Sequence, residues 1–342
     1  MLQSLGKVDW TGMIIFIPSV TAILVPFTMA GIIFKWNSPA AIAPVVLGVV
    51  GLVVLAIQQK HATNPMFRPG LFAKRVTNFS FFGLGVFGVC VNMIFYYLVV
   101  YWSGVRGYSE IITGLFLLPE TITIPVAAIV SGITMRQRGQ IRWAMLLGWP
   151  LTTVSIGLLY FLDTQTHVVV LVFINLLVGL GAGTIVSALN VTLLASTKRE
   201  DNGHAMAMGF LSKSAGMCLG IAIGTAVFTT QMDNRLKDNE DAEMVAESFM
   251  RMLHGVKDDP AGQEIIVRTL RILWWICFGL SFLAGILCIS CKYPGYYENG
   301  RAEGGPVELK HRESDSGVDS SSDRSSTPKD LSRHAVSSVG SG

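Results

Sequence analysis

Long apolar runs separated by short polar segments constrain the fold of this chain more than any other feature. A helix rises about 1.5 Å per residue, so about 20 apolar residues cross a hydrocarbon core of about 30 Å. Inside a bilayer the backbone must satisfy its own hydrogen bonds, which a helix does. We therefore predict an all-α polytopic membrane protein with about eight transmembrane helices. They are expected at about residues 10–34, 40–58, 78–103, 110–135, 143–162, 167–195, 203–231 and 270–291.

The composition excludes the soluble classes. Hydrophobic residues make up 51% of the chain and charged residues 14%, and the mean hydropathy is +0.51. A net charge of +3 is too small to indicate nucleic acid as a partner, so the lipid bilayer is the expected surrounding.

We expect no enzyme activity, no cofactor and no metal site. The five cysteines lie in or beside apolar runs, where small packing residues are the ordinary interpretation. Cys288 and Cys291 have CxxC spacing, but no second pair and no histidine cluster follows them. Metalloprotease, nucleophile and phosphate-loop motifs are absent from the sequence as well.

Positive charge predicts the orientation of the helices. Lys and Arg are concentrated in the start of the chain and in every second short loop, whereas the opposite loops hold only Lys35 and Arg106. Because cytoplasmic loops carry the excess of Lys and Arg, both termini are expected in the cytoplasm.

The remaining segments suggest four regions. Residues 1–60 hold two helices, and residues 61–77 form a proline-containing cytoplasmic linker. Residues 78–292 hold the other six, interrupted by a long outer loop at 232–267, where Asp241–His254 has helical spacing. The Ser-rich residues 293–342 are expected to be a disordered cytoplasmic tail.

Two ionisable residues fall inside apolar runs. Glu120 lies about a dozen residues into its run, near the middle of the bilayer, and must be protonated, paired or facing water. Lys213 lies nearer the cytoplasmic end of its run, where it either extends to the interface or faces a central cavity. We expect the two to meet across such a cavity; the alternative is that Glu120 bonds a neighbouring helix.

A motif in the middle of the chain resembles a known family. The stretch YYLVVYWSGVRGYSEIITGLFLLP, at 96–119, resembles the start of the C-terminal half of major facilitator superfamily transporters. The nearest likeness is to the fourteen-helix drug:proton antiporters common in fungi. KVDWTG at 7–12, SGITMRQRGQIRW at 131–143, GLGAG at 179–183 and SKSAGMCLGIAIGTAVF at 212–228 resemble other segments of the same family.

This resemblance implies an architecture and a set of site residues. It implies that the last six helices form one major facilitator half, that the first two are linker helices, and that an N-terminal half is missing from this sequence. Glu120 and Lys213 are the candidate proton-coupling residues. The candidate substrate contacts are Asn92, Tyr96, Tyr97, Trp102, Asn175 and Asn190.

The expected function is therefore secondary transport of small amphipathic compounds out of the cytoplasm in exchange for protons. The resemblance favours the plasma membrane or the vacuolar membrane. The alternative is a transporter-derived membrane protein that does not transport, such as a sensor, a regulator or an inactive fragment.

Overall fold

The computed structural model describes residues 9–29, 38–61, 69–163, 165–236 and 260–291, and every element within these ranges is helical. The elements are α2 (Trp10–Met29), α3 (Pro39–His61), η1 (Pro69–Phe72), α4 (Arg75–Val100), η2 (Tyr101–Val105), α5 (Glu110–Arg138), α6 (Arg142–Leu159), α7 (Val168–Ser196), η3 (Arg199–Asp201), α8 (Asn202–Leu236) and α10 (Pro260–Ile289). Every predicted apolar run is found as a long helix. The all-α prediction is confirmed.

Six of these helical stretches are long and apolar enough to cross a membrane. They are Pro39–His61, Arg75–Val105, Glu110–Arg138, Val168–Ser196, Arg199–Phe228 and Ile266–Ile289. The apolar stretch of α2, Trp10–Pro26, is shorter, and α6 has only 18 residues and includes Arg142 and Pro150. Helices of this length and composition identify an integral membrane protein.

The helices on either side of the long loop extend further than predicted. α8 continues to Leu236, and α10 begins at Pro260 rather than near Leu270. Polar residues continue both helices, so hydropathy alone set their ends too early. The rest of that loop, including the helix expected at 241–254, lies outside the described residues, as do residues 62–68 of the linker and the tail at 293–342.

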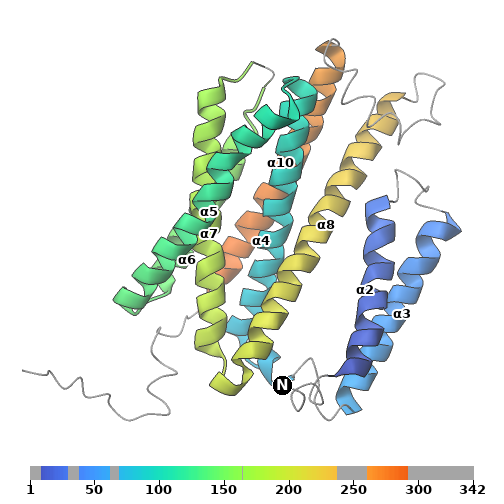
Figure 1. Cartoon of the computed structure of the whole chain (residues 1–342), viewed down its shortest axis with the longest axis vertical. Helices are drawn as coiled ribbons and strands as arrows, with labels where there is room; N and C mark the ends of the chain where they lie inside the picture. Colours follow the sequence, from blue (N-terminus) through green and yellow to red (C-terminus); the bar gives the residue numbers. More distant parts are fainter. Residues whose placement is uncertain (1–8, 30–37, 62–68, 164, 237–259, 292–342) are drawn as a thin grey trace, which may run out of the picture. The chain divides into compact units, whose positions relative to one another are not determined.

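Helix pairs in the bundle approach closely where glycines face a neighbouring backbone. α5 runs beside α7 and α4 beside α8 (Figure 1), and α10 packs against α4 and α6. A Cβ atom at Gly183 of α7 would overlap the carbonyl oxygen of Ile124 on α5, and one at Gly216 of α8 would overlap that of Gly85 on α4. Small residues at these positions allow the short separation, as is common between membrane helices.

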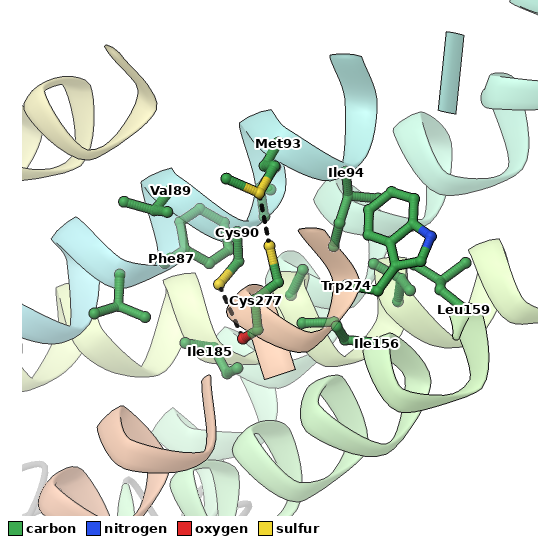
Figure 2. Close-up of a cluster of buried hydrophobic side chains, with 14 of the residues drawn as sticks. Phe87, Val89, Cys90, Met93, Ile94, Ile156, Leu159, Ile185, Trp274 and Cys277 are labelled. Carbon is green, nitrogen blue, oxygen red and sulfur yellow. Dashed lines mark hydrogen bonds between the residues drawn. The ribbon is translucent and has the colours of Figure 1, made fainter. Parts of the chain in front are cut away.

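The α4–α10 contact is an apolar core that includes two cysteines. Figure 2 shows Cys90 and Met93 of α4 beside Cys277 of α10. The Sγ atom of Cys277 lies 3.2 Å from Sδ of Met93, and that of Cys90 lies 3.7 Å from the carbonyl oxygen of Cys277. Both thiols are free and buried among aliphatic and aromatic side chains.

Candidate functional site

α5 and α7 are parallel neighbours with a constant register. Nδ2 of Asn175 donates to the carbonyl oxygen of Phe116 at 3.4 Å, and these residues are 59 positions apart. The same offset relates Gly179 to Glu120, because a Cβ atom at Gly179 would lie 3.0 Å from the Glu120 carbonyl oxygen. It also relates Gly183 to Ile124. The register therefore places the backbone of Glu120 level with Gly179, one turn beyond Asn175.

Glu120 is buried on α5, and its backbone carbonyl group faces α7. Its side chain is 0% exposed, and neither carboxyl oxygen has a hydrogen-bond partner in the described part of the chain. The sequence of α7 contains no charged residue or histidine, and neither does the stretch from Val76 to Val105 on α4 and η2. No charge on α7 or on Val76–Val105 compensates an ionised carboxylate.

Other buried polar atoms of the same region also lack partners. Asn175 is 0% exposed, and its Oδ1 has no hydrogen-bond donor among the residues described. Oγ1 of Thr113, two turns before Glu120 on α5, and Nε1 of Trp102 are likewise buried and unpaired. Buried polar groups usually find a partner, so each exception needs an explanation.

An aromatic group continues from this interface towards the end of α4. The ring of Trp102 stacks on that of Phe116 with centroids 4.4 Å apart, and Tyr108 contacts Phe116 edge-on at 5.4 Å. Trp102 belongs to η2, which is a π-helical turn. We expected the outer turn to begin at Ser103, but the helix continues to Val105. Turns of this kind often occur at functional sites.

Lys213 lies at a different interface. It is partly buried on α8, which packs against α4, and its Nζ lies 5.6 Å above the ring of Phe87. Because the Glu120 oxygens accept no hydrogen bond, the two ionisable residues are not paired in this structure. Their expected meeting across a cavity stays a prediction.

The remaining candidate residues divide between the two interfaces. Asn92 donates from Nδ2 to the carbonyl oxygen of Met217 at 2.8 Å, which joins α4 to α8. Tyr97 is buried against Gly224 of α8 and contacts Tyr96, which is 38% exposed. Asn190 is partly buried on α7. Of the predicted substrate residues, only Trp102 and Asn175 lie in the region of Glu120.

Sequence reasoning missed Phe116, Thr113 and Gly179 as members of this site. Phe116 and Thr113 lie four and seven residues before Glu120, a spacing that puts all three on one face of α5. This spacing was visible in the sequence. The contact with Asn175 and Gly179 depends on the pairing of α5 with α7, which hydropathy does not reveal.

Comparison with known proteins relates this geometry to a family. The sequence profile of the Major Facilitator Superfamily matches residues 10–221. The chain is 29% identical over 303 residues to MFS transporter L2 of a Phoma species. This alignment covers 85% of this chain and 50% of that protein. It is 25% identical to MFS efflux transporter aclA of Aspergillus oryzae, over 95% of this chain and 59% of the relative. The chain thus spans little more than half the length of these relatives.

A solved structure shares the fold. A bacterial homologue of the human lysosomal transporter Spinster, in an inward-facing and occupied conformation, superimposes with a TM-score of 0.51. The match covers 85% of this chain and 66% of the other, at 12% sequence identity. The likeness supports the helical arrangement and carries no information about the substrate.

Proposed function

The chain belongs to the Major Facilitator Superfamily, and from that premise we propose that it functions in secondary active transport. The proposed activity is export of small amphipathic compounds in exchange for protons. The names of its relatives, which include efflux transporter aclA and efflux pump FUS6 of Gibberella fujikuroi, support export. The observation that carries proton coupling is the enclosed carboxyl group of Glu120.

An unpaired carboxylate at this depth is energetically unfavourable. Insertion data put a central charge at about 2.5 to 3.5 kcal/mol. The enclosed arrangement is thus suited to the neutral acid, and ionisation requires water or a cation to arrive. A carboxyl group that ionises only when its surroundings change is suited to carrying a proton. We propose Glu120 as the proton-binding residue and Lys213 as the second ionisable group of the coupling.

We assign the substrate contacts to the aromatic and amide residues near these groups. Trp102 and Asn175 are the proposed contacts in the region of Glu120, since a ring face and an amide suit an amphipathic molecule. Asn92, Tyr96, Tyr97 and Asn190 are the further candidates, on α4 and α7.

Retention of fluorescent amphipaths by cells tests this function. The full chain is expressed in yeast that lack their major efflux pumps, and retention of ethidium, a neutral dye and an anionic dye is measured with and without a protonophore. We expect the chain to lower retention of at least one dye, and Glu120→Gln or the protonophore to abolish the effect. Thr184→Val is the matched control, because this hydroxyl bonds only its own helix at Leu180. Unchanged retention of all three dyes contradicts the proposal and favours a non-transporting protein.

A further inference from the structure

Asn175 is oriented by the one bond that its amide makes. Its contact on α5 is the carbonyl oxygen of Phe116, which only accepts hydrogen bonds. The donor must therefore be Nδ2, and this fixes Oδ1 as the atom that points away from Phe116. Oδ1 is left buried as an acceptor without a donor.

The carboxyl group of Glu120 is directed towards the same level. Helical side chains tilt towards the N-terminus of their helix, so the Glu120 side chain extends back over the turn that contains Phe116. The 59-residue register places Asn175 beside that turn. Two buried groups with unsatisfied oxygens, the Glu120 carboxyl group and Oδ1 of Asn175, thus lie at neighbouring levels of the α5–α7 pair. A neutral carboxyl group has an O–H to donate, and Oδ1 of Asn175 is an acceptor that lacks a donor.

On the basis of the proposed function, we propose that Asn175 is the positioning residue for the proton of Glu120. In the neutral state the Glu120 O–H donates to Oδ1 of Asn175 while Nδ2 remains on Phe116. On ionisation the O–H bond breaks, the electron pair stays on the carboxylate and the proton passes to an entering water molecule. The amide then turns, and Nδ2 moves from the Phe116 carbonyl oxygen to the carboxylate.

This rearrangement connects proton loss to the aromatic group. Release of the Phe116 carbonyl oxygen frees the turn of α5 whose ring stacks on Trp102. The amide is therefore a switch between the charge of Glu120 and the aromatic residues proposed to contact the substrate.

Few other titratable groups face this part of α5. The elements packed against it are α7, α4 and η2. α7 carries no titratable side chain, and Val76–Val105 contributes the Cys90 thiol and the phenols of Tyr96, Tyr97 and Tyr101. The phenol of Tyr108, which precedes α5, belongs to a ring that contacts Phe116. The other charged residues of α5 stand near its ends, at Glu110, Arg136 and Arg138.

Infrared difference spectroscopy of the full chain in lipid nanodiscs tests the proposal, because it observes the carboxyl group without transport. Glu120→Gln should remove the carbonyl band of the neutral acid, which assigns that band. Asn175→Leu removes the bond in both protonation states, and the bond to the charged carboxylate is the stronger of the two. The band should therefore move to higher frequency, and its disappearance should move to higher pH by about one unit. Asn175→Thr, which keeps a hydroxyl group, should restore part of both shifts. Thr184→Val should leave the band unchanged.

Two results would overturn the inference. One is a folded Asn175→Leu protein whose band and titration equal those of the unmodified chain. The other is a band that responds to Thr113→Val instead, since Thr113 offers the competing buried oxygen. If the band responds to the Asn175 substitutions but the chain moves no dye, the inference is supported and the proposed function is contradicted.

Discussion

At the scale of single residues, the α5–α7 region combines a buried, unpaired carboxyl group at Glu120 with unpaired polar atoms of Asn175, Thr113 and Trp102. Several other polar side chains in the bundle bond a backbone carbonyl group. Asn92 does so across helices, and Ser80, Ser155 and Thr192 do so within their own helix. A low-dielectric surrounding makes an unpaired group costly, so a cluster of them is a reason to seek function there.

Asn92 provides a test of the contrasting, structural use of an amide. Asn92→Leu removes its bond to the Met217 carbonyl oxygen, and we expect a loss of stability of about 0.6 to 2 kcal/mol. Thermal unfolding of the purified chain in detergent measures this loss. Thr121→Val, which removes an exposed hydroxyl group bonded within α5, is the control and should change stability less. Equal unfolding temperatures for Asn92→Leu and the unmodified chain would show that this bond does not contribute.

Residue types alone pointed to Glu120 as unusual, and in the structure its side chain is buried. They did not distinguish Asn175 from Asn92, because both are single amides in apolar runs. The distinction lies in which oxygen or nitrogen is left unpaired. That depends on the facing helix and is invisible to a single-chain pattern.

At the scale of elements, glycines determine how closely helices pack. The α5–α7 pair has backbone contacts at Gly179 and Gly183, and the α4–α8 pair has them at Gly88 and Gly216. Such contacts fix the register, and the register brings Asn175 to Phe116.

Gly183→Ala tests this role. The new methyl group would overlap the carbonyl oxygen of Ile124, and a backbone atom does not move aside as a flexible side chain does. We expect a loss of about 1 to 3 kcal/mol in unfolding free energy, measured by thermal unfolding in detergent. Gly279→Ala on α10 is the matched control, because nothing lies within 4 Å of the added atom. Equal stability of the two variants would mean that α5 and α7 are less closely packed than described.

The elements themselves were largely predictable. Apolar runs gave every long helix because membrane helices carry a strong hydropathy signal. The π-helical turn at Tyr101–Val105 was not predicted, since Gly104 and Gly107 suggested an earlier end. Helix pairing was also beyond the residue pattern, because apolar faces alone do not select partners.

At the scale of the whole molecule, orientation remains a prediction from charge. A single cysteine at each of two exposed positions reports the two sides of the membrane. The positions are Gln140, between α5 and α6, and Gln165, between α6 and α7. In a background without the native cysteines, an impermeant maleimide added to intact cells should label Gln165→Cys. It should label Gln140→Cys only after permeabilisation. The opposite pattern would show that the predicted orientation is inverted. Labelling of both cysteines in intact cells would contradict the predicted topology.

Family membership was predictable from motifs between Lys7 and Phe228, and the profile match at residues 10–221 confirms it. The fourteen-helix subfamily, the missing half, the proton coupling and the amphipathic class of the exported compound stay predictions. The match covers only 50% of transporter L2, so the transport activity of this chain has to be measured directly.

The most direct test of the account is proton movement caused by substrate in liposomes that contain the full chain. A pH-sensitive dye is trapped inside, and ethidium, or whichever amphipath the cell assay identifies, is added outside without an imposed gradient. We predict a change of internal pH with the unmodified chain and none with Glu120→Gln. An equal pH change in the Glu120→Gln protein would contradict the claim that this buried carboxyl group carries the proton.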